Sequence, residues 1–280
     1  MLKAAIILSL FFAQPLLCQA QHSAAIARLV PITLGVTETM HSAVLGEDRT
    51  LNIYLPEGYS PDDTTHYPVI YLLDGGVDED FVHVAGLVQF SSQPWVARLQ
   101  RSIVVGIGNT DRKRDMTFPA AIKSDKDKLP TSGGSAKFIS FLEQELQPYV
   151  QKHYKTNNSK TLIGESLAGL LAVQVLLEKP ALFSRYIIIS PSLWWNDGSL
   201  LKHAMAPVTG KTSIYLAAGK EGLAPCDAPH VMEVDANVLA DKIESLNNKQ
   251  VSFYFDYLPE ETHATIAHQA LMNAFRFFSR

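Results

Sequence analysis

The chain has 280 residues, of which 47% are hydrophobic and 19% are charged, an ordinary composition for a globular protein. It carries 24 Lys and Arg against 28 Asp and Glu, a formal net charge of −4, and its densest basic cluster is only Arg112-Lys113-Arg114. This balance argues against nucleic acid as a partner, because nucleic-acid binding needs clustered positive charge.

Residues 1–20 have the pattern of a secretory signal peptide: a cation at Lys3, an apolar run over residues 4–13 and small residues before the expected cleavage site. The run is shorter than the roughly 20 residues that span a bilayer, so we expect no stable membrane insertion. A lipid anchor at Cys18 is disfavoured because Leu17 is bulky where lipoprotein signals place a small residue. The sequence therefore predicts an exported protein, periplasmic or secreted, with 23 basic and 28 acidic residues and a net charge of −5 once Lys3 is removed.

The remaining residues, 21–280, are enough for one large domain with its own hydrophobic core. Of the two cysteines, Cys18 leaves with the signal and Cys226 stays alone. We therefore expect a single domain that does not depend on an internal disulfide.

Hydrophobic patterns along this domain alternate between those of strands and those of helices. Residues 51–55 alternate apolar and polar side chains, as a half-buried strand does, whereas 68–73 and 102–107 are continuous apolar runs typical of buried parallel strands. Further strands are predicted at 161–163, 185–189, 212–216 and 251–255, helices at 135–150, 170–177, 239–246 and 270–278, and a surface loop at 123–135. Strands that alternate with helices predict an α/β fold with a mostly parallel sheet and helices on both faces.

The strongest local motif is Gly164-Glu-Ser166-Leu-Ala168-Gly169, which lies between a predicted strand and a predicted helix. A turn this tight strains the central serine and exposes its hydroxyl at the edge of the sheet, as in the Gly-x-Ser-x-Gly nucleophile elbow, here with Ala168 at the last glycine position. A serine that merely caps the helix is the alternative interpretation. We interpret Ser166 as the nucleophile.

A serine nucleophile needs a histidine base and an acid, which follow it in that chain order in this kind of fold. His263 lies just after the last predicted strand, where a loop can bring it over the sheet edge. The acid should follow strand 212–216, which favours Glu221, with Asp227 as its competitor.

The oxyanion that forms during ester cleavage needs backbone amides already directed at it. The amide of Leu167 follows the nucleophile directly, and a second amide should come from the glycines after strand 68–73. We favour Gly76 over Gly75; an ordinary glycine turn is the alternative.

Together with four further segments, these residues resemble the putative-esterase family of the α/β-hydrolase superfamily, which includes esterase D and siderophore-ester hydrolases. The resemblance runs from about residue 52 to the C-terminus, and its other segments are 71–75, 109–117, 141–149 and 190–195. It implies cleavage of carboxylic esters through an acyl-enzyme, with no metal and no organic cofactor. The family's triad positions match Ser166, Glu221 and His263, and its second oxyanion amide matches Gly76. The sequence departs from the family at Glu165, where relatives often carry histidine, and at Ala168.

Arg112, Asp115, Trp194 and Trp195 are candidates for the substrate mouth. An equally good interpretation is an ion pair between Arg112 and Asp115 that stiffens a loop, with the two tryptophans as a packed cover.

Hydrolysis of a small-molecule ester is the leading prediction. The alternatives are acyl transfer by the same triad and a catalytically silent binding protein on this fold. The sequence does not choose among siderophore, carbohydrate and short lipid esters, and it does not specify the oligomeric state.

Overall fold

The computed structural model describes residues 30–62 and 64–279. The chain divides into two parts, residues 1–33 and 34–280, and the described residues of the first part form no helix or strand. The predicted signal peptide and Cys18 lie outside the described residues.

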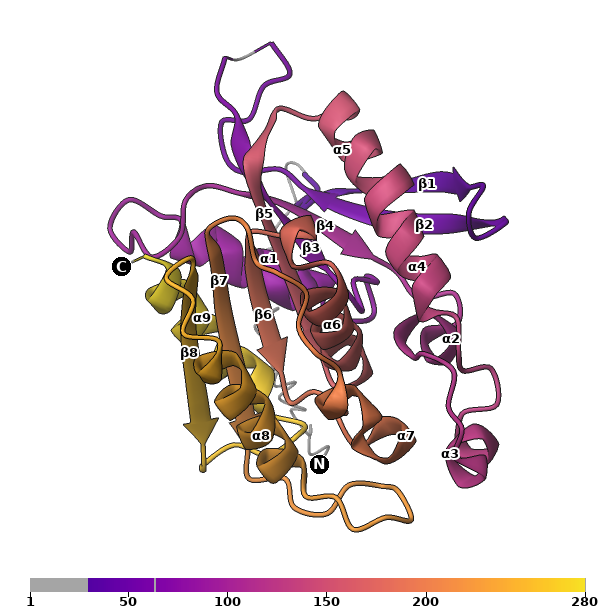
Figure 1. Cartoon of the computed structure of the whole chain (residues 1–280). Helices are drawn as coiled ribbons and strands as arrows, with labels where there is room; N and C mark the ends of the chain where they lie inside the picture. Colours follow the sequence, from indigo (N-terminus) through magenta and orange to yellow (C-terminus); the bar gives the residue numbers. More distant parts are fainter. Residues whose placement is uncertain (1–29, 63, 280) are drawn as a thin grey trace, which may run out of the picture. The chain divides into compact units, whose positions relative to one another are not determined.

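The second part is built on one twisted sheet (Figure 1). Its described residues form eight strands in the order β1-β2-β4-β3-β5-β6-β7-β8. The strands are β1 (Val36–Ser42), β2 (Glu47–Tyr54), β3 (Tyr67–Leu72), β4 (Ile103–Ile107), β5 (Thr156–Glu165), β6 (Arg185–Ile189), β7 (Thr212–Gly219) and β8 (Val251–Leu258). Strand β2 is antiparallel to β1 and β4, and all the other neighbours are parallel, so the prediction of a mostly parallel sheet is confirmed.

Helices cover both faces of the sheet, as predicted. Alternate strand residues point to opposite faces; for example, Tyr71 packs into one core with α6, and Leu72 packs into a second core with α1 and α9. The helices are α1 (Phe81–Ser91), α2 (Arg112–Met116), α3 (Lys123–Lys128), α4 (Ser135–Phe141), α5 (Gln147–His153), α6 (Leu167–Glu178), α7 (Trp195–Gly198), α8 (Met232–Ser245) and α9 (Ile266–Phe278).

Four segments differ from the sequence prediction. The predicted surface loop at 123–135 contains the short helix α3, and the predicted helix at 135–150 passes through a π-helical turn, Leu142–Leu146, between α4 and α5. Strand β1 was not predicted, because it is an edge strand whose side chains are mostly exposed and polar. Helix α1 was not predicted, because apolar residues lie on nearly all of its sides and leave no helical period.

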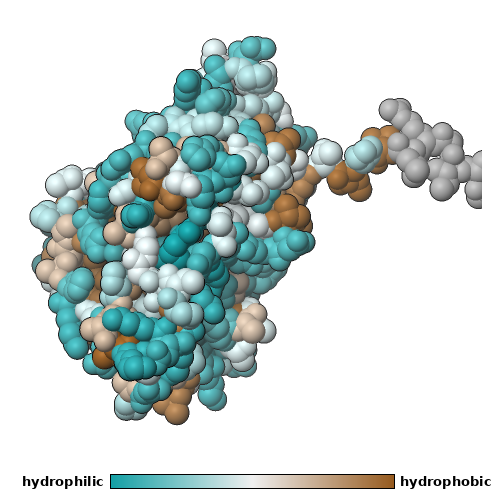
Figure 2. All heavy atoms as spheres, turned by 90° about the vertical axis from the view of Figure 1, so that its right-hand side faces the viewer, coloured by the Kyte–Doolittle hydropathy of each residue, from teal (hydrophilic) through white to brown (hydrophobic). Residues whose placement is uncertain are grey.

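No helix within the described ranges combines the length and the apolar character needed to cross a bilayer. Figure 2 shows one side of the molecule, on which hydrophilic residues dominate and hydrophobic residues form small separate patches. Scattered apolar groups of this kind are normal on protein surfaces.

Candidate active site

Ser166 lies in a tight turn between β5 and α6 and has an unusual backbone conformation, with φ 59° and ψ −119°. The turn depends on small neighbours: a Cβ atom at Gly164 would lie 2.4 Å from the carbonyl oxygen of Ala168, and one at Gly169 would lie 3.0 Å from that of Ile189. The methyl group of Ala168 is fully buried. The departure from the usual motif at Ala168 is therefore accommodated, and the strained serine is held as a nucleophile elbow requires.

His263 lies in the loop between β8 and α9 and joins Ser166 to Glu221. Its Nε2 atom is 3.1 Å from Ser166 Oγ, and its Nδ1 atom is 2.7 Å from Glu221 Oε2. An ionised carboxylate can only accept, so Nδ1 carries a proton and Nε2 is left to accept one from the serine hydroxyl. The three side chains thus form one continuous hydrogen-bonded relay.

Glu221 lies just after β7 and is held by several donors. Besides His263, it accepts hydrogen bonds from Ser190 Oγ and from the Gly219 amide, the latter at 3.2 Å, and its side chain is only 1% exposed. Burial raises the pKa of the Glu221 carboxyl, but hydrogen bonds from His263 and Ser190 outweigh burial and hold it below its usual value. Asp227, the competing acid, instead forms an exposed ion pair with Lys128 at 2.9 Å.

The electrostatic surroundings favour the charged form of His263. The hydrogen bond to Glu221 raises the pKa of the imidazole, against the opposing effect of burial. Glu165 contributes further, because its carboxylate charge also raises the pKa of His263. Burial in turn raises the pKa of Glu165 to about 7, and the nearby Asp80 adds to this shift.

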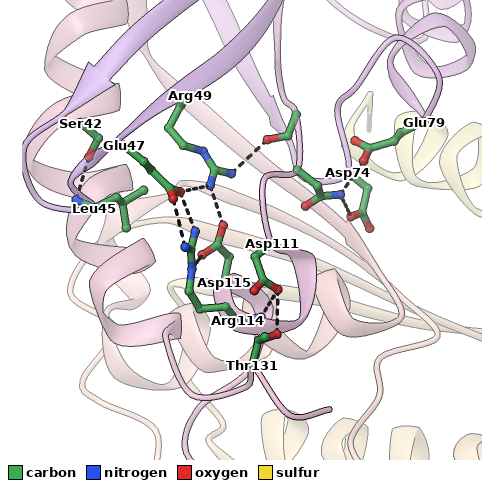
Figure 3. A network of polar contacts seen from close by, with 12 residues as sticks. Ser42, Leu45, Glu47, Arg49, Asp74, Glu79, Asp111, Arg114, Asp115 and Thr131 are labelled. Carbon is green, nitrogen blue, oxygen red and sulfur yellow. Dashed lines mark hydrogen bonds and ion pairs between the residues drawn. The ribbon is translucent and has the colours of Figure 1, made fainter. Parts of the chain in front are cut away.

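The amides considered for the oxyanion differ in their present partners. Leu167 begins α6, and its amide makes no hydrogen bond with any described residue. The Gly75 amide donates to the carbonyl of Ile107 at 2.9 Å and is therefore already engaged. The Gly76 amide donates to Glu79 Oε2 at 2.6 Å, and Glu79 Oε1 accepts from Asn109. Figure 3 shows Glu79 near Asp74.

A cavity of about 590 Å³ opens at Ser166, His263 and Glu221. Its walls combine the cationic side chains of Arg112 and Lys128 with an apolar surface. The other lining residues are Leu129, Leu167, Ser192, Trp194, Leu223, Pro225 and Met232. The residues from 128–129 and 223–232 were missed, because their segments carry no motif and approach the serine only through the fold. Within the described ranges, no group of three or more His, Cys, Asp or Glu residues is arranged to hold a metal ion.

Of the two interpretations left open for Arg112 and Asp115, the ion pair between them is wrong. Arg112 makes a bidentate pair with Asp74, at 2.7 Å for each hydrogen bond, and reaches the cavity. Asp115 is buried and binds Arg49 and Arg114 instead (Figure 3). Of this pair, only Arg112 lines the cavity.

The two neighbouring tryptophans, Trp194 and Trp195, lie in different environments. Trp194 lines the cavity, whereas Trp195 is fully buried and donates from Nε1 to the carbonyl of Phe118 at 2.9 Å. Trp195 is therefore part of the core and Trp194 part of the cavity wall.

Comparisons with known proteins agree with this geometry. The model of the family described as "Putative esterase" matches residues 42–270. The ferri-bacillibactin esterase BesA of Bacillus subtilis (strain 168) is 29% identical over 270 residues, which cover 88% of this chain and 90% of that protein.

Two solved structures are similar over most of the chain. An IroE-like serine hydrolase from Shewanella oneidensis has a TM-score of 0.76 and 31% identity, covering 86% of this chain and 79% of that one. The BES protein from Bacillus cereus has a TM-score of 0.75 and 27% identity, and the match covers 91% of this chain and 100% of that one. With its family model spanning most of its length and relatives that share its fold, the chain belongs to the "Putative esterase" family of α/β-hydrolases and is a carboxylic ester hydrolase.

Proposed function

We propose that Ser166 attacks the ester carbonyl while His263 Nε2 takes the serine proton and Glu221 stabilises the imidazolium that forms. The observation that carries this proposal is the relay of two hydrogen bonds from Ser166 through His263 to Glu221. The imidazolium then protonates the leaving alcohol, and a water molecule activated by the same histidine hydrolyses the acyl-enzyme.

The oxyanion is proposed to bind the amides of Leu167 and Gly76. The free amide of Leu167 at the start of α6 supports the first assignment, since the N-terminus of a helix favours negative charge. For Gly76 to donate to the substrate, Glu79 must first release this amide. Glu79 is exposed, so its carboxylate can be rehydrated when it leaves.

The substrate is proposed to be a siderophore-type ester, with a ferric catecholate trilactone as the first compound to test. The names of relatives support this class, since BesA is described as a ferri-bacillibactin esterase. The cavity is compatible with an anionic complex: Nη1 of Arg112 has no hydrogen-bond partner among the described residues, and the Lys128 ammonium keeps donors beyond its bond to Asp227. Trp194 and Leu129 supply the apolar surface that an aromatic ligand needs.

Export to the periplasm or the medium is proposed on the pattern of residues 1–20. N-terminal sequencing of the protein secreted by a bacterial host should then give a start near Gln21. Recovery of an intact N-terminus from the cytoplasm would contradict this part of the proposal.

The nucleophile is tested with a fluorophosphonate probe and a set of p-nitrophenyl esters. Ser166→Ala should lose the covalent label and turnover together, whereas Ser192→Ala, which changes another serine of the same cavity, should keep the label. Turnover that persists in Ser166→Ala would overturn the mechanism. The substrate class is tested separately, by chromatography of catecholate trilactones incubated with and without iron.

A further inference from the structure

A second hollow lies between the loop that joins α1 to β4 and the C-terminal end of α9. Its volume is about 440 Å³, within the range of small-molecule sites, roughly 300–1,000 Å³. Three arginines line it, Arg98, Arg101 and Arg185, and no Asp or Glu does. Figure 1 shows the C-terminal end of α9 beside this loop. Arg185 of the hollow starts β6, whereas Ser166 follows the carboxyl end of the neighbouring strand β5.

No described carboxylate forms an ion pair with these arginines. Throughout the described ranges, Arg49, Arg112 and Arg114 form ion pairs with carboxylates, and the three arginines of the hollow form none. Arg101 donates only to the backbone carbonyl of Glu57, at 3.0 Å, and the side chains of Arg98 and Arg185 make no hydrogen bond with a described residue. The hollow therefore presents unused guanidinium donors.

Arg185 is the most informative of the three. It is half-buried at the start of β6, with its guanidinium 5.2 Å from the centre of the Phe278 ring. Burial lowers the pKa of Arg185, and no carboxylate among residues 30–62 and 64–279 opposes that effect. A cation that has lost part of its hydration without gaining a counterion raises the free energy of the empty state, and a bound anion would offset this.

We propose that this hollow binds a small soluble organic anion through a phosphate or carboxylate group, held between the guanidinium groups of Arg98 and Arg185 with Arg101 at the rim. The planar fork of a guanidinium matches the two oxygens of either group. Neutral side chains that also line the hollow, Gln93 and Gln100, can bind the rest of such a ligand. An adjoining hollow of about 480 Å³ shares Arg101 but also contains Glu57, which would repel an anion, so the ligand is assigned to the first hollow.

This site is separate from the catalytic cavity. Arg185 lies opposite Thr161 of β5, five residues before Ser166, and a strand rises about 3.3 Å per residue, which places the two sites roughly 16 Å apart along the strand. The two cavities share no lining residue. A ligand in the arginine hollow therefore does not occupy the position of the ester.

Isothermal titration calorimetry with pyrophosphate and with citrate, at constant ionic strength set by chloride, tests the proposal. We expect saturable binding of at least one of them and a Kd raised about tenfold or more in Arg98→Gln and in Arg185→Gln. The matched control is Arg276→Gln, an exposed arginine of α9 outside the hollow, whose Kd should stay within about twofold. Hydrolysis of p-nitrophenyl acetate should be unchanged in all three variants, which separates this proposal from the proposed function.

Three outcomes would overturn the proposal: no saturable binding of either anion to the wild type, an equal loss of binding in the control variant, or binding only to vesicles that contain phosphatidylglycerol. The last outcome would assign the arginines to a lipid surface instead. If Arg185→Gln does not fold, Arg98→Gln still decides, because Arg98 lies in a loop and makes no side-chain hydrogen bond with a described residue.

Discussion

At the scale of single residues, His263, the proposed base, lies near carboxyl groups that affect its charge. Glu221 bonds to His263 directly, and Glu165 acts on it through space. The base must be neutral to accept a proton, so activity should rise with pH through the raised pKa of His263. The acidic limb of the pH profile thus reports on both neighbours.

Glu221→Gln should lower kcat by a factor on the order of 10³ to 10⁴, as loss of the acid does in serine proteases. It should also move the acidic limb of kcat/KM to lower pH, because the neutral amide of glutamine replaces the carboxylate that raises the pKa of His263. A pH profile with a p-nitrophenyl ester measures both effects. Asp227→Asn is the control and should leave the limb in place; a shift in this variant instead would point to Asp227 as the acid.

Glu165→Gln should stabilise the protein at pH 8 and have little effect near pH 4. Because burial raises the folded-state pKa of Glu165 from its ordinary value of 4.5 to about 7, its contribution to stability is lost as pH rises between these values. Removing the ionisable group should raise the free energy of unfolding at pH 8 by about 1–3 kcal/mol. Urea unfolding at both pH values checks this, with the exposed Glu244→Gln as control. Equal effects of Glu165→Gln at both pH values would contradict it.

Glu79→Ala tests the role assigned to Gly76. If the Gly76 amide binds the oxyanion, freeing it from Glu79 should raise kcat/KM about two- to tenfold, less than the roughly hundredfold or greater effect of deleting such a donor. Steady-state kinetics with a neutral ester measure the change. Asp78→Ala removes an equal charge from the adjacent exposed position and should have no effect. An unchanged or lower kcat/KM in Glu79→Ala would remove Gly76 from the proposed site.

At the scale of elements, a buried ionic cluster joins β2 to α2, the helix that carries Arg112. Arg49 is fully buried, 2.6 Å from Asp115 and 5.2 Å from the centre of the Phe138 ring (Figure 3). Arg114 bonds both Asp115 and Glu47, which extends the cluster to the surface. The position of Arg112 in the cavity thus depends on charges that never contact the substrate.

Asp115→Ala should destabilise the protein by about 3–5 kcal/mol, because it leaves the charge of Arg49 buried with less compensation. The double variant Arg49→Met with Asp115→Leu should be less destabilised than Asp115→Ala, since it removes both charges and keeps the volume filled. Urea unfolding of both variants provides the comparison. If the double variant instead has a lower free energy of unfolding than Asp115→Ala, the ion pair itself stabilises the fold.

Elements with a regular hydrophobic pattern could be predicted from the sequence. The buried runs of β3, β4 and β6 were located almost to the residue, because a strand covered on both faces needs a continuous apolar sequence. Strand β1 and the helix α3 could not be predicted, because tertiary contacts hold them: Asp125 of α3 is buried and accepts from the backbone amide of Asn196.

The candidate site also combines residues that could be predicted from the sequence with contacts that could not. Ser166, Glu221 and His263 were predicted from their order along the chain, and the structure brings the three together. The pairing of Arg112 with Asp74 and the bond of Glu79 to Gly76 could not be predicted, because each depends on which way a side chain turns.

At the scale of the whole molecule, parallel strands bring the three residues of the proposed triad to one edge of the sheet. Ser166 follows β5, Glu221 follows β7 and His263 follows β8, each at the carboxyl end of its strand. Ligands of α/β proteins bind outside this edge, so the location of the cavity is a property of the topology.

Packing within a single chain should be enough to hold this arrangement. Cys226 is a free cysteine, and the other cysteine, Cys18, belongs to the predicted signal. A reducing agent should therefore shift the Tm of the processed protein by less than about 2 °C, as scanning calorimetry would show. A larger decrease would reveal a covalent link between copies of the chain.

The buried guanidinium of Arg49 also determines how β2 can align with its neighbours. Arg49, Leu51 and Ile53 point to the same face of the sheet. A slip of one residue would turn Arg49 away from Asp115, move Leu51 and Ile53 to the opposite face and direct Thr50 and Asn52 into the core that Leu51 and Ile53 now fill. Misaligned pairings of β2 are thereby penalised twice, once by polar side chains placed in this core and once by an unmatched charge.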